Sequence, residues 1–140
     1  MDTFSKDKRR WNMQQIRSKN TSPELTVRSF LHRNGFRFRV CDPRLPGKPD
    51  IVLKKYKLII QIRGCFWHQH PGCKRATIPS SNVEYWIPKL QKNVERDKQN
   101  DRLLLESGWH LSVIWECEVN NGSFKQKLMA LLPFFKNEQI

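Results

Sequence analysis

The sequence predicts an α/β protein in which helices flank a small central sheet. First, 140 residues with 38% hydrophobic and 28% charged side chains suit a single globular domain. Second, helical and extended patterns follow one another in the order helix, three strands, long loop, helix, strand, helix. Third, the run Leu58-Ile59-Ile60 is apolar on both faces, which is typical of a central strand with cover on each side.

The first helix begins at residues 21–24 (TSPE), which combine a hydroxyl cap, a proline in the first turn and an acid near the positive end of the helix dipole. Apolar residues then recur on one face until Gly35, which favours a helix stop. Residues 36–41 alternate in character and predict a strand. The Pro- and Gly-rich residues 42–49 predict a loop.

The same patterns give the remaining elements. A tight turn at Lys54-Lys55 is expected to join two strands, and a long loop rich in Cys, His, Pro and Ser follows them. In order, the expected elements are strands over 50–53 and 56–62, the loop over 64–83, a helix over 84–107, a strand over 111–115 and a helix over 123–135 ending near Pro133. Trp115, on the last strand, is expected in the core.

The net charge and the domain organisation of the chain narrow the classes of function that it can have. Residues 1–20 are expected to form a basic arm that runs into a short helix, and residues 21–140 a single domain. The net charge of +13, from 26 Lys and Arg against 13 Asp and Glu, favours a nucleic acid partner because neutralised phosphates release bound counterions. No secretory signal is recognisable and no apolar run approaches the roughly 18 residues of a membrane span. We therefore expect a cytoplasmic protein with no membrane partner.

Cysteine and histidine are concentrated in residues 65–73 (CFWHQHPGC). Cys65, His70 and Cys73 can close around one ion, and Cys117 at the end of the last strand can complete a tetrahedron. Such thiolate-rich sets suit structural Zn²⁺, which would order a loop that is too long to order itself. The alternatives are a set of unrelated thiols with a surface histidine, or His68 as the ligand in place of His70.

Five segments together resemble the very short patch repair endonucleases. They follow one another in that family's order over roughly residues 10 to 120, and they are residues 46–50 (PGKPD), 64–68 (GCFWH), 84–86 (EYW), 92–97 (KNVERD), and 108–109 with 115–117 (GW and WEC). The resemblance implies a restriction-endonuclease-like fold with a mixed sheet, a structural zinc and a Mg²⁺ active site. It also implies cleavage of double-stranded DNA on the 5′ side of the thymine in a T:G mismatch left by 5-methylcytosine deamination.

The resemblance further implies roles for individual residues. Asp50 matches a carboxylate that binds Mg²⁺, with the backbone carbonyl of Ile62 as a second contact. His68 matches a histidine that assists proton transfer, and Glu24 an acid that reaches the metal's water shell. The zinc ligands implied are Cys65, His70, Cys73 and Cys117, and the aromatic residues implied to intercalate beside the mismatch are Phe66, Trp67 and Trp86. From local sequence alone, a capping or turn residue is the preferred interpretation of Asp50, and core packing is the usual interpretation of the aromatic residues.

Basic residues near these segments are candidates for phosphate contacts: Lys74, Arg75, Lys89, Lys92 and Arg96. The resemblance implies a monomer acting on DNA, and contacts with other mismatch-repair proteins and an association with the bacterial nucleoid are expected with it.

One stretch departs from the family pattern. Gln61-Ile62-Arg63 stands where other members of the broader fold place acidic or basic catalytic residues, so Arg63 is a candidate to stabilise the charged phosphate without acting as a base. This departure supports one alternative, a zinc-containing DNA-binding module without catalysis. Two further alternatives stay open, a related nuclease with another target and a nuclease acting on RNA.

Overall fold

The computed structural model describes residues 22–138, with side chains described up to residue 132. The expected arm at residues 1–20 therefore lies outside the described residues. The sheet contains β1 (Arg39–Val40), β2 (Ile51–Leu53), β3 (Leu58–Arg63) and β4 (His110–Trp115). The helices are α2 (Ser22–Arg33), the short 3-10 helix η1 (Lys54–Tyr56), α3 (Val83–Glu106), α4 (Glu116–Asn121) and α5 (Phe124–Glu138).

The four strands form one mixed sheet in the order β1-β2-β3-β4. β1 with β2 and β2 with β3 are antiparallel, whereas β3 and β4 are parallel and pair from Leu58 with His110 to Arg63 with Trp115. A parallel neighbour needs a crossover, which the long loop and α3 supply. This mixed sheet between helices agrees with the fold that the resemblance implies.

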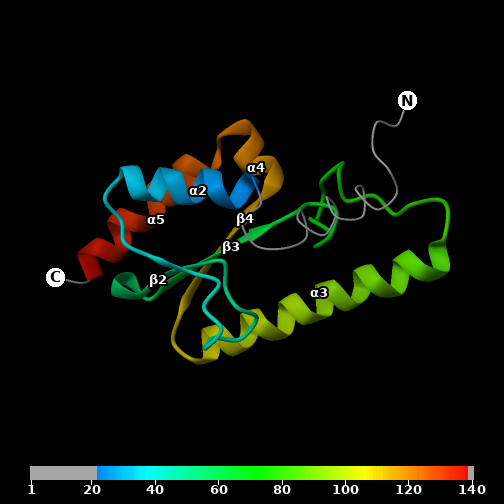
Figure 1. The fold of residues 1–140 in the computed structure, drawn as a ribbon, viewed down its shortest axis with the longest axis horizontal. Helices are drawn as coiled ribbons and strands as arrows, with labels where there is room; N and C mark the ends of the chain where they lie inside the picture. Colours follow the sequence, from blue (N-terminus) through cyan, green and yellow to red (C-terminus); the bar gives the residue numbers. More distant parts are fainter. Residues whose placement is uncertain (1–21, 139–140) are drawn as a thin grey trace, which may run out of the picture.

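Two apolar clusters cover the two faces of the sheet. α2 and α5 pack on one face around Ile60 and Ile114, while α3 contributes Leu104 to a smaller cluster with Val52 and Ile59 on the other. Figure 1 shows α3 alone below the sheet and α2, α4 and α5 together above it. Because Ile59 and Ile60 point to opposite faces, both clusters explain why this strand is apolar on both sides.

The first strand is shorter than the alternating sequence suggests. Pairing with β2 is confined to Arg39 and Val40, although the pattern predicts a strand over residues 36–41. The reason lies in the partner, because β2 ends at Leu53 and the chain turns into η1 before reversing at Lys57, where φ is +53°. Residues 36–38 therefore face a helical turn, and β3 begins at Leu58 instead of residue 56.

The C-terminal part differs in two ways. The short helix α4 was not expected; its first turn carries Glu116 and Glu118, and the Glu118 carboxylate accepts a hydrogen bond from the Trp115 N–H. α5 also continues beyond Pro133 to Glu138, so the expected stop near Pro133 is wrong. Proline removes one backbone donor, and the helix continues on either side of that missing bond. Within residues 22–138, no helix is long and apolar enough to cross a membrane.

Candidate functional site

Asp50 lies immediately before β2 and beside the end of β3. Its carboxylate Oδ2 accepts a hydrogen bond of 2.7 Å from the Ile62 N–H, and its own N–H donates to Oε1 of Gln61 over 3.3 Å. The antiparallel pairing of β2 with β3 produces this meeting of residues that are far apart in the sequence. Gln61, which departs from the family pattern, is thus a buried residue that helps to hold the Asp50 backbone.

The Asp50 carboxyl lies among other charged groups. Burial raises its pKa from 3.8 to about 6, and the charge of Glu24 adds to that rise. The Ile62 N–H and the charges of His68 and Arg28 act in the opposite direction. Two acids, one from α2 and one from the sheet, therefore lie close enough to repel each other, an arrangement that a hard cation would relieve.

Glu24 is buried near the start of α2, with 8% of its surface exposed. Its carboxylate is 3.1 Å from the guanidinium of Arg28, one helical turn later. Burying a carboxylate without a partner is costly, and Arg28 offsets that cost. The role of Arg28 was missed from the sequence, although its place four residues after Glu24 on one helix was a usable signal.

His68 is held by a residue from α3. Its Nδ1 lies 2.6 Å from Oδ2 of Asp97, and both side chains are half-buried. A carboxylate on Nδ1 fixes the ring and presents Nε2 for proton transfer. Asp97 is the last residue of the segment 92–97 that carries the resemblance, yet no role was predicted for it, because only folding brings α3 against the long loop.

Arg63 is engaged in a buried ion pair. Its guanidinium is 2.6 Å from the carboxylate of Asp101 on α3, and 11% of its side chain is exposed. This pair fastens the end of β3 to α3, one turn beyond Asp97. The geometry gives Arg63 a structural contact, and a role on the phosphate would require this pair to open.

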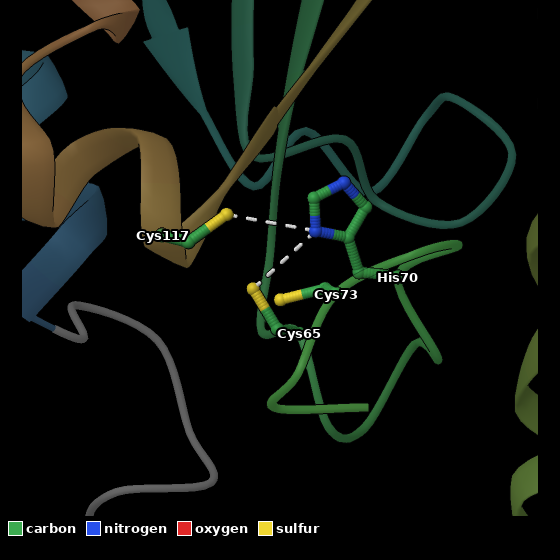
Figure 2. Close-up of side chains that lie close together, drawn as sticks. All are labelled: Cys65, His70, Cys73 and Cys117. Atoms are coloured by element: carbon green, nitrogen blue, oxygen red, sulfur yellow. Dashed lines mark hydrogen bonds between the residues drawn. The ribbon is translucent and has the colours of Figure 1, made fainter. Parts of the chain in front are cut away.

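The four residues of the Cys/His cluster converge on one point (Figure 2). The ligand atoms of Cys65, His70, Cys73 and Cys117 all lie within 4.8 Å of one another. The Nδ1 atom of His70 is 3.7 Å from Sγ of Cys65 and 3.5 Å from Sγ of Cys117. Donor atoms bound tetrahedrally at the usual zinc distances would be about 3.5 to 3.8 Å apart. The cluster therefore fits one four-coordinate metal ion. His70 is the histidine of this cluster, whereas His68 contacts Asp97.

The register of the sheet brings the cluster together. Arg63 pairs with Trp115, so Cys65 and Cys117 each follow a paired residue by two positions. Trp115, expected in the core, is half-buried and stacks on the His70 ring with centroids 4.1 Å apart. An ion pair of 3.1 Å between Arg75 and Glu116 joins the loop to α4. Cys41, the remaining one of the four cysteines, lies after β1 and outside the cluster.

A metal ion in the cluster would have to displace the proton of the Cys65 thiol. Burial raises the pKa of the Cys65 thiol to about 12, whereas the backbone N–H of Arg75 lowers the pKa of Cys73. A thiol as buried as Cys65 stays protonated at neutral pH unless a cation stabilises the thiolate.

Aromatic rings gather between the loop and the start of α3. Phe66 lies 5.2 Å from Trp67 and 5.5 Å from Trp86, centroid to centroid, and the two tryptophans are 5.8 Å apart. Asn93 on α3 donates a 3.2 Å hydrogen bond to the Trp67 carbonyl, which fixes the loop backbone. All three rings remain partly exposed, so the cluster lies at the surface, next to His68 in the sequence.

Comparisons with known proteins agree with this geometry. A family model described as "DNA mismatch endonuclease Vsr" matches residues 1–75. The DNA mismatch endonuclease Vsr of Escherichia coli is 40% identical over 116 residues, which covers 83% of this chain and 74% of the relative. The chain belongs to the Vsr family of DNA mismatch endonucleases.

Two nicking enzymes are similar to this member of the Vsr family over nearly the whole chain. The Type II nicking enzyme V.NmeAIP of Neisseria meningitidis is 48% identical, with 97% of each chain covered. The Type II nicking enzyme V.XorIIP of Xanthomonas oryzae pv. oryzae is 44% identical, with 94% of this chain and 96% of the relative covered. The protein is therefore a DNA endonuclease, a hydrolase of phosphodiester bonds in DNA, and the part matched by the Vsr model includes Asp50 and His68.

Proposed function

We propose that this endonuclease nicks one strand of double-stranded DNA on the 5′ side of the thymine in a T:G mismatch, using Mg²⁺. The observation that carries the proposal is the convergence of the Asp50 and Glu24 carboxylates with the His68–Asp97 pair beside an exposed aromatic cluster. The carboxylates and the His68–Asp97 pair suit phosphodiester hydrolysis, and the aromatic cluster suits recognition of a weakened base step.

Asp50 and the carbonyl of Ile62 would hold Mg²⁺, with Glu24 reaching its water shell. The N–H and C=O of one strand residue point to the same side, so the Ile62 carbonyl faces the side on which its N–H meets Asp50. Bound Mg²⁺ would supply positive charge to offset the charge that develops on the phosphate. His68, oriented by Asp97, would accept a proton from the attacking water through Nε2.

The metal of the Cys/His cluster is proposed to be zinc, in a structural role. Three thiolates and one imidazole fill a tetrahedron and leave no open position for a substrate. We further propose that the enzyme acts as a monomer. A DNA substrate also places the proposed activity at the nucleoid of the bacterial cytoplasm, where other mismatch-repair proteins would meet it.

A nicking assay on short duplexes tests the proposed reaction. A duplex with one T:G mismatch and the same duplex fully paired are incubated with zinc-loaded protein, with and without Mg²⁺. A Mg²⁺-dependent nick 5′ to the mismatched thymine is expected. Equal cleavage of both duplexes would point to a nuclease with another target, and tight binding without any cleavage would point to a DNA-binding module.

Replacing Trp67 with alanine should reduce the preference for mismatched over paired DNA by about tenfold or more. An inserted ring must offset an unstacking cost of a few kcal/mol, which is smaller at a mismatch than at a paired step. Trp67→Phe keeps a ring and should retain most of the preference. The measurement is the ratio of nicking rates on the mismatched and the paired duplex. An unchanged ratio in Trp67→Ala would mean that Trp67 only packs against its neighbours.

Replacing Asp97 with asparagine should lower kcat on the order of 100-fold while KM stays within about twofold, because His68 would lose the group that orients it. Asp101→Asn is the matched control, since Asp101 lies one turn later on α3 and binds Arg63. Single-turnover nicking gives both constants. Similar losses of kcat in the two variants would argue against a specific role for Asp97.

A further inference from the structure

A strongly basic groove extends from the middle of β2, two residues beyond Asp50, to the β2–β3 turn. It has a volume of about 440 Å³ between two segments that diverge, residues 35–39 on one wall and residues 52–56 on the other. Figure 1 shows the β2–β3 turn and the long loop at opposite ends of β3.

Charge dominates the rim of this groove. Arg37 and Arg39 come from one wall and Lys54 and Lys55 from the other, and all four side chains are exposed. Among the described residues that line the groove, none is acidic. The nearby carboxylate of Asp42 is held by two hydrogen bonds from the Arg44 guanidinium. Four cations around one groove favour an anionic occupant.

The floor of the groove is apolar. Phe36 and Phe38 pack against the main core cluster, and Phe36 meets the Tyr56 ring edge to face at 5.7 Å. Tyr56 is 7% exposed, so it offers no open face on which a base could stack. Phe36 and Phe38 are partly exposed, so the floor is an apolar surface on which aliphatic side chains of an occupant can pack.

The edge of the sheet also opens at this groove. β1 is an edge strand, and its pairing with β2 stops at Arg39, so residues 36–38 do not pair with β2. Extended peptides commonly add to such edges, where main-chain hydrogen bonds give affinity and alternate side chains give specificity. A volume of 440 Å³ holds a few residues of one extended chain and is too small for a duplex.

We propose that this groove binds an extended acidic peptide segment of a partner protein, with alternating acidic and aliphatic side chains. The acidic side chains would pair with the four cations of the rim, and the aliphatic ones would cover the floor. The groove contains none of the residues assigned to cleavage or to the mismatch, so its function is separate from the proposed nicking reaction.

A fluorescein-labelled peptide of ten residues, alternating aspartate and valine, tests the proposal by fluorescence anisotropy at physiological salt. We expect Arg37→Glu with Arg39→Glu to weaken peptide binding at least tenfold. Lys54→Glu with Lys55→Glu, on the opposite wall, should do the same, and it decides the question if the first variant fails to fold. Lys98→Glu with Lys125→Glu changes the net charge equally on exposed helix positions elsewhere, and should weaken binding less than about threefold.

Three results would overturn the proposal. The first is that the peptide does not bind the wild-type protein, and the second is that peptide binding is weakened equally in the groove and control variants. The third is that the groove variants lose binding to a labelled ten-nucleotide thymidine strand while their peptide binding stays unchanged. Nicking of the T:G duplex should be the same in the groove variants as in the control variant. That comparison separates failure of the groove proposal from failure of the proposed enzymatic function.

Discussion

Replacing Asp50 with asparagine should abolish detectable nicking and, at the same time, raise the melting temperature of the Mg²⁺-free protein. The first effect follows from losing a charged ligand for Mg²⁺, which is worth several kcal/mol of transition-state stabilisation and so about 10³-fold or more in rate. Asparagine keeps an oxygen that can accept the hydrogen bond from the Ile62 N–H, so the local backbone geometry should survive.

The second effect follows from the raised pKa of Asp50. Its folded-state value of about 6 lies above the ordinary 3.8, so between these values the folded protein binds more protons than the unfolded chain. The free energy of unfolding therefore falls as the pH rises from about 4 to 6, and it stays lower above pH 6. Removing this cost should add about 1 to 3 kcal/mol at pH 7.5.

Thermal melts at pH 4.5 and 7.5, without Mg²⁺ and without chelator so that the Cys/His metal stays bound, measure this change. The gain in Asp50→Asn should be larger at pH 7.5 than at pH 4.5. Full nicking activity in this variant would remove Asp50 from the mechanism. A lower melting temperature at both pH values would mean that the carboxylate supports the fold.

Replacing Cys117 with serine should destabilise the whole domain, lowering the melting temperature on the order of 10 °C or more. A metal held by the cluster would join the loop after β3 to the start of α4, and loss of one thiolate would remove one of its four ligands. Bound zinc, measured by inductively coupled plasma mass spectrometry, should fall from about one equivalent to well below it.

Cys41→Ser is the matched control, because Cys41 is a free thiol outside the cluster. It should keep its zinc and melt within a few degrees of the wild-type protein. An unchanged melting temperature in Cys117→Ser, or an equal loss in both variants, would contradict a structural metal at this cluster.

The order of elements could be predicted because the patterns are local. Alternation, helix stops and the doubly apolar run at Leu58–Ile60 each depend on a few neighbouring residues, and the mixed sheet between helices follows from them. Prediction from the sequence failed where pairing with another segment decides the secondary structure. Residues 36–38 have the pattern of a strand, yet η1 leaves them no neighbour to pair with.

The candidate site divides in the same way. The Cys/His spacing is mostly local, so the cluster could be named from the sequence, whereas Asp97, Arg28 and the stacking of Trp115 on His70 depend on how α3, α2 and β4 meet the loop. The ion pair of Arg63 with Asp101 belongs to the same group. Nothing in the sequence around Arg63 indicates that its charge is already matched by a residue 38 positions later.

The register that places Cys65 and Cys117 side by side also shapes how the chain can fold. Cys65, His70 and Cys73 lie within one short segment and can hold a metal before any sheet exists, whereas Cys117 joins only after a loop of about 50 residues has closed. Closing the longer loop costs about 1.5 kcal/mol more chain entropy than closing the short one. The unfolded chain should therefore bind metal weakly through three ligands, which reduces the net stabilisation and lets the loaded segment act as an early nucleus onto which β4 later docks.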